Sequence, residues 1–185
     1  MKRTKEVEEK IESHLREGNI SLILDSYDDI FSDFDPRAYD QRTLSDDFLS
    51  ECRKAVHSKT EDYSGFELRL LVSKAKRNSN DEEKIKKRLS LYFEKHYHET
   101  LIEIKQIRKH GVFFIVLGAV LTLIGALLAS KEGLIYHVLI VLFEPAGWFT
   151  IWNGFDRVLI EPRKKSQEQL FYKKMTNLDI KFYPY

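Results

Sequence analysis

The sequence predicts a membrane α-helical hairpin of two transmembrane helices that carries a cytoplasmic α+β domain built from both ends of the chain. Two long apolar runs lie in the second half of the chain, separated by four residues. Short stretches typical of β-strands lie near both ends. Basic residues border the apolar runs at the ends distant from the short connection. These features together indicate a polar domain attached to two membrane spans.

The two apolar runs have the length of membrane spans. Residues 111–129 are 19 residues without a charge, which is about 28 Å of α-helix and close to the thickness of the hydrocarbon layer. The second run, residues 134–152, contains one acid, Glu144. Residues 130–133 suffice for a tight turn and are too few for a domain. A hairpin buried in a soluble protein is the alternative, and it leaves the uneven flanking charge unexplained.

Charge is distributed unevenly along a chain whose net charge is +1. Residues 1–104 contain 19 Lys and Arg against 23 Asp and Glu, whereas residues 105–185 contain 11 against 6. Basic residues at the span ends are Lys105, Arg108, Lys109, His110, Arg157, Arg163, Lys164 and Lys165. By the positive-inside rule, both termini are cytoplasmic and the protein lies in the plasma (inner) membrane. Because the basic excess follows the membrane, we expect no nucleic-acid partner.

Short helices and strands are predicted for the first part of the chain. Residues 4–17 have the apolar spacing of a short helix, and residues 20–24 are typical of a buried strand. Ser45 is expected to cap a helix that ends near His57, with two aspartates in its first turn. The apolar face of that helix is expected to contain Phe48, Leu49, Cys52 and Val56.

Further elements connect the spans to the polar regions. Residues 65–72 predict a strand. Ser79 begins a long helix that either continues into the first span as a rigid stalk or breaks near the membrane surface. After the spans, Pro162 is expected to begin a basic helix that ends near Met175. Residues 177–185 alternate like a strand and are predicted to return and pair with the N-terminal strands.

The predicted elements form three regions. Residues 1–109 are the cytoplasmic α+β domain with the stalk helix, and residues 111–152 are the transmembrane hairpin. Residues 153–185 are a cytoplasmic helix and strand that pack on the N-terminal domain.

Glu144 is the most unusual residue of the second span. It lies near the middle of the bilayer, where an ionised carboxylate costs roughly 3 kcal/mol or more. Pro145 follows it and removes one backbone donor. Helical spacing places Glu144 on one face with His137, Val141, Trp148 and Trp152. Two interpretations remain open: an ion or proton site in an oligomer, or a protonated carboxyl that hydrogen-bonds across a helix interface, which is favoured.

The first span has small residues on one face. They are Gly118, Thr122, Gly125, Ala126 and Ala129, spaced mostly three or four apart. Such faces let helices approach closely in lipid, so we expect this one to meet the second span or another copy.

Residues 25–47 are rich in aspartate, with eight Asp against Arg37 and Arg42. Asp33 and Asp35 have a spacing that can hold Mg²⁺ or Ca²⁺, but a proline follows at once and no glycine allows a coordinating loop. We therefore expect turn, cap and ion-pair roles, with both arginines pairing with these acids, and no metal site.

A family resemblance rests on motifs along most of the chain. Asp-Phe-Asp-Pro-Arg at residues 33–37 and Leu-Ser-Asp-Asp-Phe-Leu at residues 44–49 resemble a family of small prokaryotic two-span membrane proteins of unassigned function. The strand at residues 66–72 and Gly-Trp-Phe-Thr-Ile-Trp at residues 147–152 occupy matching places. Residues 155–157 depart from the family pattern, which has more tryptophan there. The resemblance implies a membrane location and no particular activity.

The motifs point away from catalysis. No Ser-His-Asp order, Cys-x-x-Cys pair or phosphate-binding glycine loop is present, so we expect neither an enzyme nor a cofactor. We expect a membrane anchoring or scaffolding module that self-associates in the lipid bilayer and contacts a cytoplasmic protein partner through residues 25–42. The alternative is a small oligomeric ion channel or transporter subunit with Glu144 lining the path.

Overall fold

The computed structural model describes residues 20–57 and 67–185, so the helix expected over residues 4–17 lies outside the described part. The chain divides into two compact units. The second unit is residues 98–170, and residues on both sides of it in the sequence form the first.

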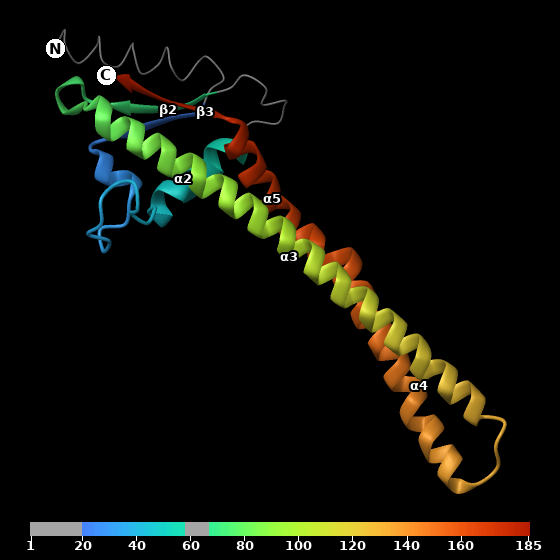
Figure 1. Cartoon of the computed structure of the whole chain (residues 1–185). Helices are drawn as coiled ribbons and strands as arrows, with labels where there is room; N and C mark the ends of the chain where they lie inside the picture. Colours follow the sequence, from blue (N-terminus) through green and yellow to red (C-terminus); the bar gives the residue numbers. More distant parts are fainter. Residues whose placement is uncertain (1–19, 58–66) are drawn as a thin grey trace. The chain divides into compact units, whose positions relative to one another are not determined.

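The first unit contains a parallel sheet of three strands in the order β1 (Ile20–Leu24), β2 (Glu67–Val72) and β3 (Asp179–Pro184). Leu68 of β2 lies opposite Ile20 on one side and Ile180 on the other. The red C-terminal strand therefore lies alongside strands from the N-terminal half of the chain (Figure 1). The prediction that the tail returns to pair with these strands is confirmed.

Two helical connections join the parallel strands. β1 leads to β2 through a 3-10 helix, Tyr27–Ile30, and through α2 (Asp46–His57). β2 leads to β3 through a short 3-10 helix, Lys74–Lys76, and then through three long helices. These are α3 (Ser79–Leu128), α4 (Leu134–Phe155) and α5 (Glu161–Asn177). Parallel strands need such long crossovers, and here one crossover contains the whole apolar hairpin.

One face of the sheet and the surrounding helices form the core of the first unit. The sheet contributes Ile20, Leu24, Leu68, Leu70, Ile180 and Phe182. The helices contribute Phe48, Leu49, Cys52 and Val56 from α2, Ile85, Leu89 and Phe93 from α3, and Phe171, Tyr172 and Met175 from α5. The predicted apolar face of α2 is therefore confirmed.

The second unit contains a helical hairpin. α3 (Ser79–Leu128) is continuous through the first apolar run, so the long predicted helix does not break before it. A turn that ends at Gly133 leads into α4 (Leu134–Phe155). Gly133 has a φ of 127°, which a residue with a side chain adopts only under strain. Figure 1 shows α3 and α4 running in opposite directions to and from the hairpin tip.

A π-helical turn, Asp156–Ile160, joins α4 to α5 (Glu161–Asn177). The predicted basic helix is therefore present and begins one residue before Pro162, but it continues α4 through this turn instead of starting as a separate helix. Within the turn, the Glu161 N–H donates to Asp156 O, a wider bond than that of an α-helix. The following proline has no N–H, and the helix tolerates it at this irregular turn.

Both hairpin helices expose apolar side chains. They include Val112, Phe113, Val116, Val120, Leu123 and Leu127 on α3 and Leu134, Ile135, Val138, Val141, Leu142 and Phe149 on α4. The structure has two helices that are long and apolar enough to cross a membrane, and only 17% and 6% of their most apolar windows is buried.

Candidate functional site

The contact loop, residues 25–42, is the first candidate surface, and hydrogen bonds hold both of its ends. Ser26 caps the 3-10 helix that follows β1, and the Asp29 carboxylate accepts a hydrogen bond from the Ser26 N–H at 3.0 Å. At the other end, the Ser32 N–H donates to Thr43 O at 2.9 Å. The loop is thus joined to β1 and to the segment before α2 by defined contacts.

The Asp35 carboxylate organises the centre of the contact loop. Arg37 donates to it from Nε and Nη2 at 2.8 and 2.6 Å. Thr43 donates from its backbone N–H and from its hydroxyl, both at 2.8 Å. The Arg37 guanidinium and then the Thr43 N–H hold the pKa of Asp35 well below its usual range. Both carboxylate oxygens are used inside the loop, and the expected bidentate pair with Arg37 is present.

Arg42 pairs with a different acid from those expected. Its guanidinium forms an ion pair with Asp28 and donates two hydrogen bonds to Ser32 O, at 3.3 and 3.2 Å. It also lies 5.7 Å from the centroid of the Phe31 ring. Arg42 therefore connects the two ends of the loop, while Arg37 holds its centre.

Phe34 is 97% exposed in this organised loop. The carboxylate of its neighbour Asp33 is also exposed and makes no ion pair or hydrogen bond with the residues described here. The sequence did not single out Phe34, because the pattern of an aromatic residue among aspartates does not show whether the ring is buried or exposed. One feature of the sequence could have indicated that Phe34 is exposed. It lies between two aspartates, the second of which precedes a proline, and such a turn offers an aromatic ring little to pack against.

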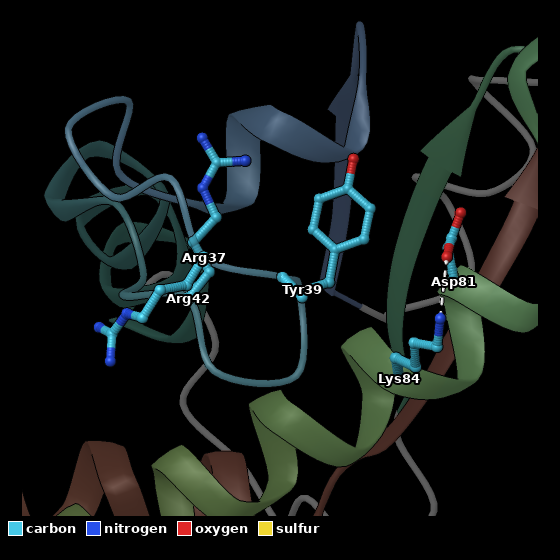
Figure 2. Close-up of a pocket in the computed structure, with 6 residues that line it drawn as sticks. Arg37, Tyr39, Arg42, Asp81 and Lys84 are labelled. Carbon is cyan, nitrogen blue, oxygen red and sulfur yellow. Dashed lines mark ion pairs between the residues drawn. The ribbon is translucent and has the colours of Figure 1, made fainter.

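An open pocket of about 300 Å³, the Tyr39 pocket, is lined by Arg37, Ala38, Tyr39, Arg42, Asp81 and Lys84. Figure 2 shows that Tyr39 and the two arginines come from the loop, whereas Asp81 and Lys84 come from α3. The Tyr39 ring stacks on Phe31 with centroids 5.3 Å apart, and burial raises the pKa of its hydroxyl. Asp81 and Lys84 form a long ion pair of 3.6 Å. The pocket therefore has a neutral aromatic wall, and each of its three basic residues forms an ion pair with an aspartate.

The second candidate surface is the Glu144 face of α4, which consists of His137, Val141, Glu144, Trp148 and Trp152. All five are exposed or partly exposed, with Val141 70% and Trp148 64% exposed. His137 Nδ1 lies 3.1 Å from Gly133 O, so this nitrogen is within hydrogen-bond distance of a carbonyl at the start of its own helix. The Glu144 carboxylate makes no hydrogen bond or ion pair with any residue that the structure describes. One copy of the chain therefore leaves Glu144, and Pro145 beside it, on an outer surface.

Three of the five predicted packing residues of α3 lie against α4. A Cβ added to Gly118 would lie 2.7 Å from Gly147 O, and the ideal Cβ of Gly125 meets Glu144 Cγ at an ordinary 3.4 Å. Thr122 lies against Gly147, and its hydroxyl donates to Gly118 O at 2.9 Å. Ala126 is exposed on α3, and Ala129 lies just beyond α3 and is also exposed. Within the hairpin, this face therefore meets the second span.

Glycines at seven-residue spacing line the contact between α3 and α4, and we call this row the glycine seam. They are Gly111, Gly118 and Gly125 on α3 and Gly147 and Gly154 on α4. A Cβ on Gly154 would lie 2.7 Å from Gly111 O, and one on Gly111 would lie 2.9 Å from Gly154 O. Sequence reasoning missed Gly111, Gly147 and Gly154, although their spacing of seven was visible in the sequence.

Comparisons with known proteins do not identify a family for this chain. Among residues 20–57 and 67–185, no group of three or more His, Cys, Asp or Glu side chains is placed to hold a metal ion. The resemblance based on residues 33–37 stays a prediction. Searches with protein-family models, among curated proteins and among solved structures gave no match.

Proposed function

We propose that the protein is an integral membrane module that anchors its small α/β unit at the cytoplasmic face of the inner membrane. The exposed surface of the hairpin carries this proposal. Phe113, Leu127 and Phe149 are 61%, 65% and 71% exposed on it. In water, apolar surface costs about 25 cal/mol per Å², whereas a bilayer accepts it.

Chain connectivity supports the anchoring role. The hairpin lies between β2 and β3, so both of its ends return to the same sheet. The α/β unit is therefore connected to the spans twice, by α3 and by α5. Insertion into a membrane by itself would require only one helix between the α/β unit and the spans.

Exposed basic side chains support the cytoplasmic orientation. Lys105, Arg108 and Lys109 are exposed on α3, and Arg163 and Lys164 are exposed on α5. The connection at the hairpin tip contains a single basic residue, Lys131. By the positive-inside rule, this excess of basic residues at the ends of the spans distant from the tip favours a cytoplasmic location for both chain ends.

Fractionation and cysteine labelling test location and orientation together. We expect the chain to stay with membranes after an alkaline wash and to leave them in detergent. Ser130→Cys should react with an impermeant maleimide added outside intact cells, and Lys54→Cys should react only after lysis. Native Cys52 gives little background, because burial raises the pKa of its thiol to about 12. Recovery in the aqueous fraction would remove the anchoring role, and reversed labelling would remove the orientation.

We further propose that copies associate through the Glu144 face. A carboxyl in the middle of a bilayer needs a hydrogen-bond partner or a polar cavity, and one copy supplies neither among its described residues. A second copy places a second carboxyl within reach, so that two protonated Glu144 side chains satisfy each other.

The exposure of Glu144 also favours a second candidate function, an oligomeric ion channel or transporter subunit. In that case Glu144 lines a path formed by several copies, because two spans cannot enclose one alone. His137 and Trp148 on the same exposed face would line the same path.

Two substitutions separate these roles. If Glu144 joins copies, Glu144→Gln should keep the oligomer in detergent, since an amide still hydrogen-bonds, whereas Glu144→Ala should weaken it. If Glu144 lines a path, vesicles with the native chain should pass cations and Glu144→Gln should stop the flux. Absence of flux from the native chain removes the channel role. A native chain that is monomeric in lipid removes both.

The contact loop is the surface that we propose for a protein partner. Asp35 and Arg37 hold its centre and Arg42 holds its ends, so its shape is set before any partner arrives. Asp33 remains exposed for contact. A preorganised loop loses little conformational entropy on binding, which favours a contact role over a flexible connection.

A further inference from the structure

Phe34 is held out in solution by a loop that is otherwise well satisfied. Its ring is 97% exposed, whereas its neighbour Asp35 accepts hydrogen bonds from two other residues. Phe34 is therefore exposed although the loop around it is well ordered by hydrogen bonds. Exposed aromatic rings on preorganised loops are the common anchors of protein contacts, because their burial is favourable and their ordering costs little.

The Tyr39 pocket has the dimensions and the lining to receive such a ring. Its volume is about 300 Å³, and a cavity of about 150 Å³ already holds benzene. Tyr39 offers an aromatic wall and Ala38 leaves space beside it. Phe34 does not occupy the pocket of its own chain, because its ring is almost fully exposed.

Charge favours a second copy as the occupant. The contact loop has six aspartates and two arginines, and both arginines are already paired within it. The loop is thus acidic beside Phe34, where Asp33 has no partner among the described residues. Of the basic residues that line the pocket, Arg37 and Arg42 are paired with Asp35 and Asp28 inside the loop. Lys84 forms only a long ion pair with Asp81 and is 48% exposed. The acidic loop is poorly suited to an anionic membrane surface, and its exposed Asp33 is complementary in charge to Lys84 in the pocket of another copy.

We propose that Phe34 of one copy inserts into the Tyr39 pocket of a second copy, and that the second copy returns the same contact. Asp33 then lies near Lys84 of the other copy, whose ion pair with Asp81 is long. Such a reciprocal contact is self-complementary and closes at two copies instead of extending into filaments. The inference rests on the proposed role of the loop as a contact surface and names its occupant.

Fluorescence transfer between full-length chains in detergent tests the contact. Lys54 is 70% exposed, so Lys54→Cys accepts donor and acceptor dyes while buried Cys52 does not. Empty micelles in excess keep one chain per micelle. We expect transfer that is lost on dilution, with a dissociation constant raised at least tenfold by Phe34→Ala and by Ala38→Trp, which fills the pocket. Leu91→Ala and Ala38→Ser are the matched exposed controls and should leave it unchanged.

A mixing experiment makes the test specific. A Phe34→Ala chain keeps its pocket and an Ala38→Trp chain keeps its ring, so the mixture can form one of the two contacts. Both chains also carry Glu144→Ala, which removes association through the spans, and we expect transfer in their mixture at concentrations where neither variant alone shows any. No concentration-dependent transfer in the native chain, or equal transfer in the native chain and Phe34→Ala, overturns the proposal.

The outcome is separable from the proposed anchoring role. Glu144→Ala should leave the transfer through the loop intact, because the Glu144 face belongs to the other unit of the chain. If Phe34→Ala has no effect while the chain still fractionates with membranes, the second-copy contact is removed and the anchoring role stands. Transfer that Glu144→Ala abolishes and Phe34→Ala leaves unchanged assigns self-association to the spans and overturns the loop contact.

Discussion

At the scale of single residues, buried or shielded charges are stabilised by several partners. Glu82 at the start of α3 is 5% exposed and receives two hydrogen bonds from Arg77, both at 2.8 Å, and one from the Tyr27 hydroxyl at 2.9 Å. The same hydroxyl accepts from the Asn78 N–H at 2.9 Å. The Arg77 pair outweighs burial and lowers the pKa of Glu82. Tyr27 therefore links the loop side of the unit to the first turn of α3.

Tyr27→Phe should lower the free energy of unfolding of the α/β unit by about 1–3 kcal/mol, because it leaves a buried carboxylate and a backbone N–H each short of a partner. Urea unfolding of the full chain in detergent, followed by near-UV circular dichroism, measures the change. Tyr136→Phe on α4 is the control and should have no effect on this transition. A loss below about 0.5 kcal/mol would show that the hydroxyl is dispensable.

Glu67 on β2 is the second such residue. Lys181 of β3 forms an ion pair with it, and Arg69 Nε and Tyr183 Oη each donate at 2.9 Å. The Lys181 hydrogen bond is the main reason that the pKa of Glu67 falls to about 2. Two of these partners belong to β3, so the charge on Glu67 contributes to the attachment of the C-terminal strand.

The α/β unit should lose stability as the pH falls below about 5. The pKa of Glu67 is lower in the folded chain, so the unfolded chain binds more protons below its own pKa of about 4.5. The stabilisation is complete above that value and is lost as the pH approaches about 2. Melting temperatures measured from pH 7 to pH 3 for the native chain and Glu67→Gln test this. The two curves should converge at low pH, and parallel curves would contradict the role of the charge.

At the scale of elements, the glycine seam decides how close α3 and α4 lie. Gly118 and Gly147 face each other so closely that a Cβ on either would meet the opposite backbone at 3.0 Å or less. Gly125, one heptad further, has ordinary space for a methyl group. Small residues at such positions allow the backbone approach on which helix association in lipid depends.

Gly118→Ala should destabilise the hairpin by about 1–3 kcal/mol, because its methyl group would lie 2.7 Å from Gly147 O and force the helices apart. Gly125→Ala is the matched control in the same helix and should be neutral or stabilising, since its Cβ contact is 3.4 Å. Unfolding in mixed detergent and denaturing surfactant measures both. Equal effects of the two substitutions would show that the seam is not close-packed.

The third strand is the element that returns from the hairpin to the sheet. Phe182 is 6% exposed and its ring meets Tyr27 edge-on at 5.7 Å. Phe182→Ala should therefore cost the α/β unit about 3–5 kcal/mol. Asp179→Asn on the exposed end of the same strand is the control and should cost little. A near-zero effect of Phe182→Ala in urea unfolding would mean that β3 does not contribute to the core.

At the scale of the whole molecule, the hairpin is an insertion within a β-α-β crossover. β2 and β3 are neighbours along their full length, from Glu67 opposite Asp179 to Val72 opposite Pro184. The two halves of the chain are therefore held together independently of the peptide connection at the hairpin tip.

Cutting that connection tests the arrangement. A protease site inserted at residues 130–133 should be cleaved without releasing either fragment, because strand pairing and the glycine seam keep them associated. We expect a tag on the N-terminal fragment to copurify the C-terminal fragment in mild detergent. Separate elution of the two fragments would contradict the pairing, and release only after Phe182→Ala would locate the stronger contact in the sheet.

The sequence by itself determined the parts whose signal is local. Span length follows from counting apolar residues, and periodicity predicted β1, α2, the long α3 and the returning tail, because each depends on residues close together in the chain. Choices among distant partners are not local. The tertiary structure alone decided that the sheet is parallel and that Arg42 pairs with Asp28. It also decided that Glu144 and Phe34 face outward, because a side chain's neighbours depend on which remote segment packs beside it.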